Sequence, residues 1–190
     1  ANLILGTDLL EHPEKAEGAN NIVIVGGGVV GCETAHWLAN EYGKNVTVLE
    51  MLPHFMMGVC TANRGHLLHY LEKSGVRLYN CTKVKALAKD GVYVEQNQSQ
   101  TVPDPYNTWQ PLLPPNIPNP MEKAIKEEIV EKKIPADLIV LAMGGKADET
   151  FFFEAGEEHL AKEIYNIGDS SRAGRVLEAV RGAYHLAVRI

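Results

Sequence analysis

A run of glycines near the start of the chain is the feature whose residue types and spacing indicate chemistry most clearly. Gly26, Gly28 and Gly31 satisfy the pattern GxGxxG, and Gly27 adds another glycine inside it. In a dinucleotide-binding turn the first glycine permits a tight turn, the second lets the main chain approach a pyrophosphate, and the third allows a helix to pack closely on a strand. Exposed amide N–H groups and the positive end of that helix would then favour an anionic diphosphate.

The segments on either side of the glycines fit this interpretation. Ile22–Val25 is short, β-branched and uninterrupted by polar residues, which is typical of a strand buried on both faces of a parallel sheet. Val29 and Val30 then begin an apolar pattern with helical spacing, and Gly43 is placed to end that helix as a C-cap. The order of strand, glycine turn and helix makes the motif much more specific than the glycine spacing alone.

Glu50 is the second residue that indicates nucleotide chemistry. It ends a predicted strand that begins at Asn45, and it lies 19 residues after Gly31. At this position a carboxylate can accept hydrogen bonds from the ribose diol of adenosine, and it would repel a 2′-phosphate. Met51 and the three residues after it supply no arginine to bind such a phosphate. We therefore predict NADH rather than NADPH, bound by Gly26–Gly31, Glu50 and Met51.

Other polar residues near the motif have less specific interpretations. Glu33 is expected in the first turn of the helix, where the helix dipole favours a carboxylate, and a role near the nicotinamide end of the cofactor is equally compatible. Cys32 is predicted to be a small buried packing residue. His66 and His69 share one helical face, but no cysteine or carboxylate completes a compact set around them. No metal site is predicted.

The wider pattern predicts an α/β fold with a Rossmann-like, doubly wound parallel sheet. A helix from Thr61 and a strand at Val76–Tyr79 complete a β-α-β-α-β order. Residues around the turn at Asp90-Gly91 alternate between polar and apolar, so an antiparallel β-meander is expected next. The apolar run Asp137–Ala142 predicts a further buried strand. We expect the NAD(H)-binding domain to span residues 20–147.

The remaining segments give weaker structural signals. Residues 1–19 are polar and turn-rich and predict an irregular lead-in. Seven of the ten prolines fall in residues 102–120, where neither a helix nor a central strand can persist. Met121–Lys133 is heavily charged with a narrow apolar side, which predicts a surface helix. Ile164–Ile167 predicts a short strand, and an apolar stripe from Val176 onwards predicts a final helix.

Composition excludes several classes of partner. The chain has 190 residues with a formal net charge of −6 and no cluster of basic residues, so no nucleic-acid partner is expected. The longest apolar run, Leu138–Met143, is far shorter than the roughly 20 residues that cross a bilayer, so no membrane partner is expected. The three cysteines fit neither a disulfide framework nor a CxxC pair. A reducing, cytoplasmic location is therefore expected.

Several stretches of the sequence resemble one family of flavoenzymes. Asn21–Ala35, Val46–Pro53 and Ile164–Asp169 are similar to the C-terminal FAD- and NAD(P)H-binding region of the multidomain NADH:flavin oxidoreductases. This family includes relatives of 2,4-dienoyl-CoA reductase, 2-enoate reductase and trimethylamine dehydrogenase. Residues 102–120 and Leu141–Gly145 resemble the enoate reductase branch most. The resemblance covers nearly the whole chain, although its dinucleotide motifs are shared with the wider disulfide-reductase-like flavoproteins.

The resemblance implies a partial second dinucleotide-binding domain, of the FAD type. In this family an NAD(P)H-binding fold is inserted into an FAD-binding fold. Residues 1–19 would then be a remnant of the FAD-binding domain, and residues 148–190 would be its returning segment. By that match Gly168 and Asp169 would face FAD, with Asp169 hydrogen-bonded to its ribityl or pyrophosphate region.

Three further candidate cofactor residues follow from the same resemblance. Ala142, Met143 and Gly144 stand where the family has Ala-Thr-Gly, on the strand that returns toward the flavin. The first glycine fingerprint of the family, which holds the FAD pyrophosphate, does not occur in this sequence. FAD would therefore be absent from this chain or loosely held.

The resemblance also implies a function and a partner. The chain would be an electron-entry module that passes hydride from NADH to FAD, for the reduction of an activated C=C bond in a full-length enzyme. Its partner would be an N-terminal flavin-binding barrel of the same chain that carries FMN and an Fe–S cluster, and the small-molecule substrate would bind elsewhere. By itself the fragment would not be active.

The alternative is a non-catalytic module that holds an adenine nucleotide such as ADP. A disulfide reductase is disfavoured because there is no redox-active cysteine pair.

Overall fold

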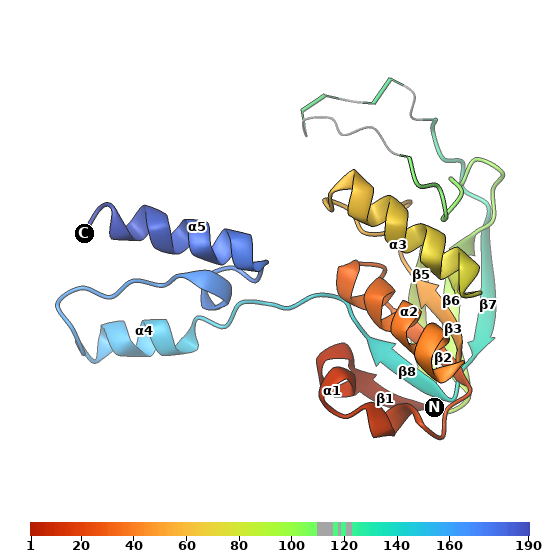
Figure 1. Cartoon of the computed structure of the whole chain (residues 1–190), viewed down its shortest axis with the longest axis horizontal. Coiled ribbons are helices and arrows are strands. Elements are labelled where there is room, and N and C mark those ends of the chain that lie inside the picture. Colours follow the sequence, from red (N-terminus) through yellow and green to blue (C-terminus); the bar gives the residue numbers. More distant parts are fainter. Residues whose placement is uncertain (110–115, 118, 121–122) are drawn as a thin grey trace. The chain divides into compact units, whose positions relative to one another are not determined.

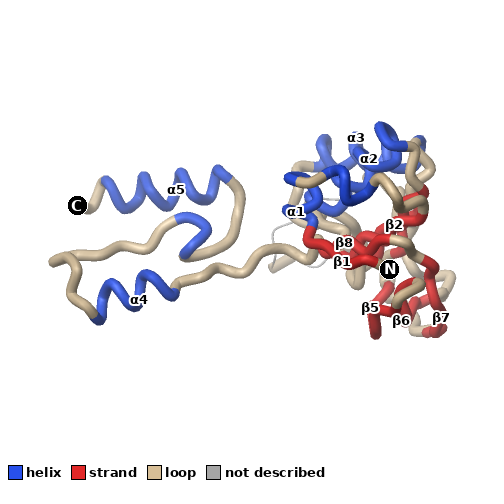
Figure 2. The backbone as a smooth tube through the Cα atoms, turned by 90° about the horizontal axis from the view of Figure 1, so that it is seen from below, coloured by secondary structure: helices blue, strands red, loops and turns tan. Residues whose placement is uncertain are grey.

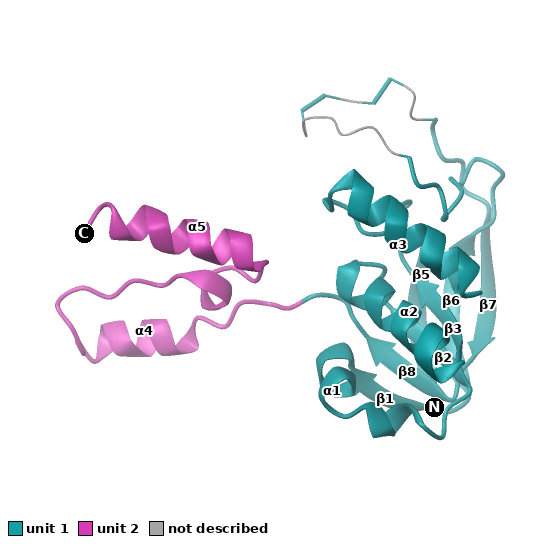
Figure 3. Ribbon diagram, in the orientation of Figure 1, with its two compact units in different colours: residues 1–144 teal, residues 145–190 magenta. Residues whose placement is uncertain are grey.

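The structure is a computed structural model that describes residues 1–109, 116–117, 119–120 and 123–190. The chain forms two compact units, Ala1–Gly144 and Gly145–Ile190, which Figure 3 shows in different colours. The glycine run and Glu50 belong to the first unit, and Gly168 and Asp169 belong to the second. None of the helices in the described residues is long and apolar enough to cross a bilayer.

A parallel sheet forms the centre of the first unit, with the strand order β1-β8-β2-β3-β4. Its strands are β1 (Asn2–Leu5), β2 (Asn21–Val25), β3 (Asn45–Leu49), β4 (Arg77–Tyr79) and β8 (Leu138–Leu141). Every neighbouring pair is parallel. The carboxyl ends of all these strands therefore lie along one edge of the sheet, where α/β folds bind their ligands (Figure 1).

Helices cover one face of this sheet, and a smaller sheet covers the other (Figure 2). The helices are α1 (Gly6–Glu11), α2 (Val29–Tyr42) and α3 (Thr61–Lys73), with a 3-10 turn, η1, at Pro13–Ala16. Along β2, Ile22 and Ile24 pack into the core on the helical face, whereas Val23 and Val25 pack into the core on the opposite face. The apolar run of β2 is thus buried on both faces, as its sequence predicted.

The smaller sheet is the predicted antiparallel meander. Together with the parallel sheet, it confirms the predicted Rossmann-like α/β fold class. It has the order β5-β6-β7, and its strands are β5 (Thr82–Ala88), β6 (Gly91–Asn97) and β7 (Ile129–Pro135). The turn at Asp90-Gly91 joins β5 to β6, as the sequence indicated. Residues 102–109 contain no helix or strand, and most of the predicted proline-rich loop beyond them lies outside the described residues.

The helix predicted over Met121–Lys133 was wrong. Residues 123–128 are not helical, and β7 pairs with β6, with Ile134 opposite Val92. The main-chain pairing with β6 and the burial of Ile134 are long-range contacts, which outweigh the helical propensity of the charged residues. The first two residues of the predicted helix lie outside the described part of the chain.

The irregular lead-in predicted for residues 1–19 was also wrong. These residues form β1, α1 and η1, and β1 pairs with β8 at the edge of the parallel sheet. Leu9 of α1 is fully buried in the core on the helical face. The partner strand β8 lies more than a hundred residues further along the chain, so no local pattern could show that the segment is ordered.

The second unit consists of two helices and the chain that joins them. They are α4 (Thr150–Glu157) and α5 (Val176–Ala187), with a short 3-10 turn, η2, at Gly168–Ser170. The predicted final helix is confirmed by α5. The strand predicted at Ile164–Ile167 was wrong, because this segment pairs with no strand of the described residues.

Candidate functional site

The glycine turn between β2 and α2 has a backbone that only glycine adopts easily. Gly26 has φ of +115°, and its N–H donates to the carbonyl oxygen of Leu49 at 2.9 Å. A Cβ atom at Gly26 would lie 2.4 Å from the carbonyl oxygen of Ala142, at the end of β8. The first glycine of the motif therefore lets the turn pass close to two neighbouring strands.

Two other glycines are held by close packing. A Cβ atom at Gly31 would lie 2.0 Å from the carbonyl oxygen of Gly26, so the first turn of α2 rests directly on the glycine turn. A Cβ atom at Gly27 would lie 2.4 Å from the ring of Phe55. The motif gave Gly27 no packing role of its own, and the structure supplies one.

Gly28 faces open space instead. No atom lies within 4 Å of the position that its Cβ would take, and Gly28 is the N-cap residue of α2 with no side-chain cap. The next residues are Val29, which is half-buried, and Val30, which is exposed. The free N–H groups of the first turn of α2 therefore have room beside them for an anionic group.

The carboxylate of Glu50 lies against this turn. One oxygen, Oε2, accepts the N–H of Gly27 at 2.9 Å, and the other, Oε1, accepts the N–H of Leu52 at 2.8 Å. Both oxygens are thereby oriented, and each can accept a further hydrogen bond from the hydroxyl of a sugar. The structure thus joins the two features that the sequence singled out, and it places a negative charge beside the turn.

The loop after Glu50 continues along the glycine turn. Met51 is 65% exposed, whereas Phe55 is fully buried under Gly27. The N–H of Met56 donates to the carbonyl oxygen of Gly27 at 2.8 Å. Sequence reasoning missed Phe55 and Met56, because they occur in a stretch without periodicity or a motif.

Cys32 and Glu33 differ sharply in environment. Cys32 is fully buried, and burial together with the charges of Glu50 and Glu33 raises the pKa of its thiol to about 12. The Cys32 side chain is therefore a protonated packing group. Glu33 is exposed, and it was wrongly expected in the first turn of the helix, because α2 begins at Val29 and has no acidic residue in that turn.

The residues after β8 border the same edge of the sheet. Ala142 donates its N–H to the carbonyl oxygen of Val25 at 2.8 Å, which brings it next to the glycine turn. Met143 is 68% exposed, and Gly144 has φ of +87°. Ala142 thus lies in contact with the turn, and Met143 and Gly144 lead away from it to the end of the first unit.

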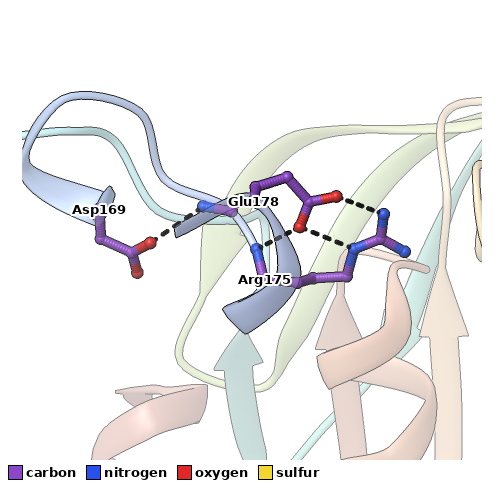
Figure 4. A network of polar contacts seen from close by, with 4 residues as sticks. Asp169, Arg175 and Glu178 are labelled. Atoms are coloured by element: carbon purple, nitrogen blue, oxygen red, sulfur yellow. Dashed lines mark hydrogen bonds and ion pairs between the residues drawn. The ribbon is translucent and has the colours of Figure 1, made fainter. Parts of the chain in front are cut away.

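Of the remaining candidates in the second unit, Asp169 belongs to a polar network with Arg175 and Glu178 (Figure 4), and Gly168 precedes it in the chain. Gly168 has φ of +69°, and Oδ1 of Asp169 accepts the N–H of Gly174 at 3.2 Å. At the start of α5, the Glu178 carboxylate accepts the N–H of Arg175 at 3.0 Å and pairs with its guanidinium at 2.6 Å. Asp169 therefore shapes the loop that leads into α5.

The histidines singled out in the sequence contact an aromatic ring. His66 and His69 lie edge-on to Tyr70, with ring centroids 4.7 Å and 5.7 Å from it. In the described part of the chain, no group of three histidine, cysteine, aspartate or glutamate side chains is placed to hold a metal ion.

Comparison with known proteins gives a consistent family. The model of the family described as "Pyridine nucleotide-disulphide oxidoreductase" matches residues 6–164. The NADH oxidase of Thermoanaerobacter brockii is 26% identical over 96% of this chain and 23% of its own length. The cinnamate reductase of Clostridium sporogenes is 22% identical over 93% of this chain and 22% of its own length. The chain therefore spans less than a quarter of each of these relatives.

Solved structures show the same fold. A 2-naphthoyl-CoA reductase complex superposes with a TM-score of 0.72 and 24% identity, over 99% of this chain and 23% of that one. The histamine dehydrogenase of Rhizobium superposes with a TM-score of 0.70 and 15% identity, over 100% of this chain and 26% of that one. The predicted resemblance to multidomain flavin oxidoreductases is confirmed by these matches.

Proposed function

Because this chain belongs to the pyridine nucleotide-disulphide oxidoreductase family, we propose that its first unit binds NADH and delivers its electrons to a flavin. The observation that carries the proposal is the hydrogen bond of 2.9 Å between the Gly27 N–H and the Glu50 carboxylate. It joins a diphosphate-type turn to a carboxylate that can bind a ribose, at the carboxyl edge of a parallel sheet.

Each part of the site has a distinct role in this proposal. The open space at Gly28 and the first turn of α2 would hold the diphosphate, and Glu50 would accept hydrogen bonds from the adenosine ribose. The Glu50 carboxylate also disfavours a 2′-phosphate, which selects NADH over NADPH. Bound NADH supplies a hydride and FAD accepts it, while the protein positions and tunes the two cofactors.

The second unit is proposed to belong to an FAD-binding domain. The family match ends at residue 164, and the resemblance of Ile164–Asp169 supports Gly168 and Asp169 as residues that face FAD. In a full-length enzyme of the cytoplasm, an N-terminal barrel with FMN and an Fe–S cluster would receive the electrons. Relatives named cinnamate reductase and 2-naphthoyl-CoA reductase support an unsaturated acid or acyl-CoA as the final substrate.

Nucleotide titration tests the proposal directly. We expect saturable quenching or enhancement of NADH fluorescence with the purified chain, and weaker binding of NADPH. Glu50→Ala should weaken NADH binding by about tenfold or more, since hydrogen bonds to a charged group contribute roughly 1.5–3 kcal/mol. Glu41→Ala, which removes an exposed carboxylate from the last turn of α2, is the matched control and should bind like the wild type. A preference for NADPH in the wild type would contradict the assignment of Glu50.

A second candidate function is a non-catalytic module that binds an adenine nucleotide. The observation that favours it is the small core of the second unit, where Ala155 is the only buried residue among those described. A unit with so little core is a weak base for a flavin site. Anaerobic mixing of the chain with FAD and NADH separates the two functions, since bleaching of the flavin band supports electron transfer and an unchanged band supports the binding module.

A further inference from the structure

Arg64 is a buried cation that neither the motif nor the proposed chemistry uses. It lies in the first turn of α3, and it is only 4% exposed. Its Nε donates to the carbonyl oxygen of Phe55 at 2.9 Å, and its Nη1 donates to the carbonyl oxygen of Asn107 at 3.0 Å. No described carboxylate lies within ion-pair distance of this guanidinium. A buried charge without a counterion is costly, so its position calls for a specific explanation.

The peptide group between Phe55 and Met56 connects Arg64 to the glycine turn. Its carbonyl oxygen accepts from Arg64, and its N–H donates to the carbonyl oxygen of Gly27 at 2.8 Å. The N–H of Gly27 in turn donates to Oε2 of Glu50 at 2.9 Å. One chain of hydrogen bonds therefore runs from the guanidinium to the carboxylate proposed to bind the ribose.

The backbone at this peptide is strained. Met56 has φ of +52°, in the left-handed region that side-chain-bearing residues adopt rarely. Such a conformation persists only where the surrounding structure holds it. Burial of the Phe55 ring under Gly27 holds one side of the peptide, and the Arg64 guanidinium holds its carbonyl oxygen.

We propose that Arg64 is a positioning residue of the nucleotide site, which sets the place of the Glu50 carboxylate through the Phe55–Met56 peptide and Gly27. The positive charge polarises this peptide, which makes the Met56 N–H a stronger donor to Gly27. Gly27 is then fixed between that donor and Glu50. The proposal rests on the proposed function, because it deepens the role of Glu50 in binding NADH.

The Asn107 contact extends the same role to a second segment. Arg64 Nη1 holds the carbonyl oxygen of Asn107, and Nδ2 of the buried Asn80 donates to the carbonyl oxygens of Pro53 and Pro103 at 2.7 Å and 2.8 Å. Two side chains thus tie the loop after Glu50 to the first part of the proline-containing segment. Of these two side chains, only Arg64 donates to the Phe55–Met56 peptide, which contacts the glycine turn.

The test compares two variants of Arg64 in two backgrounds. Arg64→Met removes the donors and the charge, and Arg64→Lys keeps the charge with a single flexible group. We expect the Kd for NADH to rise about tenfold in Arg64→Met and about threefold in Arg64→Lys, as for the loss of one charged hydrogen bond and its partial rescue. Arg77→Met, which removes an exposed guanidinium from β4, is the matched control and should leave the Kd unchanged.

Combination with Glu50→Gln separates positioning from general stability. If Arg64 acts through Glu50, its substitution should change the Kd by less than about twofold in the Glu50→Gln background, because the two sites are coupled. Equal effects of Arg64→Lys in both backgrounds would overturn the proposal, and this holds even if Arg64→Met does not fold. If the wild type and both Arg64 variants bind NADH with the same Kd, only the role of Arg64 is overturned. Wild-type chain that binds no NADH overturns the proposed function.

Amide hydrogen exchange of the free protein checks the same chain of contacts without nucleotide. We expect faster exchange of the Met56 and Gly27 amides in Arg64→Lys, while amides of β2 keep their protection. Unchanged exchange at Met56 and Gly27 would contradict the proposed role of Arg64.

Discussion

The two units of the chain differ in how much of their apolar surface they bury. In the first unit, a parallel sheet is covered on both faces, and residues such as Ile24, Leu38 and Val140 are fully buried. In the second unit, helix α5 has a regular apolar stripe, yet Val176 is 80% exposed and Tyr184 is 66% exposed. The contrast shows that a local apolar pattern is enough to specify a helix, whereas a core needs partners from distant parts of the chain.

The same contrast applies to the two groups of candidate cofactor residues. Glu50 and the glycine turn are held by packing and by main-chain hydrogen bonds from several elements of the first unit. Asp169 is held by a single hydrogen bond from a residue five positions further along the chain. The residues of the proposed NADH site are therefore held by several elements of the first unit, while the proposed FAD-facing residues have only local support within the second.

The largest expected effect comes from a large-to-small substitution made in both units. Leu38→Ala should lower the free energy of unfolding of the first unit by about 2–5 kcal/mol, because it opens a cavity in a fully packed core. Val180→Ala in α5 should change stability by less than about 0.5 kcal/mol, because that side chain is 59% exposed. Urea unfolding followed by circular dichroism measures both. Equal losses for the two substitutions would contradict the contrast between the units.

Glycine substitutions should have opposite signs in the two units. Gly26→Ala should destabilise the first unit by about 1–3 kcal/mol, through its positive φ and the contact with the carbonyl oxygen of Ala142. Gly182→Ala, within α5, meets no atom within 4 Å and should stabilise the helix by about 0.5–1 kcal/mol. Thermal unfolding of each variant gives the sign, and a stabilising Gly26→Ala would show that the turn does not need its left-handed backbone.

The smallest expected effect is the pH dependence of α5. The Arg175 side chain lowers the pKa of Glu178 from 4.5 to about 2. A lowered pKa in the folded state means that the contribution of this cap to stability is present above pH 4.5 and is lost as the pH falls toward 2. Helical circular dichroism should therefore decrease slightly over this range, and Glu178→Gln should remove that decrease. A transition of equal size in Glu178→Gln would assign the pH dependence to other groups.

The sequence could predict the parts of the fold that depend on neighbouring residues. Ile22–Val25, the glycine turn and Glu50 were placed correctly because strand, turn and helix follow one another directly. The strands β1 and β7 were missed because each is ordered by a partner strand distant in sequence. A strand that is ordered by such distant pairing need not show a periodic pattern of apolar residues in its own sequence.

The supporting residues of the site were beyond prediction for a related reason. Arg64 follows Phe55 by nine residues, and the two are joined by a loop with a left-handed residue at Met56. Neither residue type indicates that a guanidinium will hold a main-chain carbonyl oxygen beneath the glycine turn. The error for Glu33 is smaller. It was expected in the first turn of α2, but the helix already begins at Val29, so Glu33 lies beyond that turn.

The structure of the chain with bound NADH tests the central claim most directly. The account predicts the diphosphate beside Gly28 at the start of α2, and the adenosine ribose hydrogen-bonded to the Glu50 carboxylate while Gly27 keeps its contact with Oε2. A diphosphate bound elsewhere, or a Glu50 carboxylate turned away from the sugar, would contradict it.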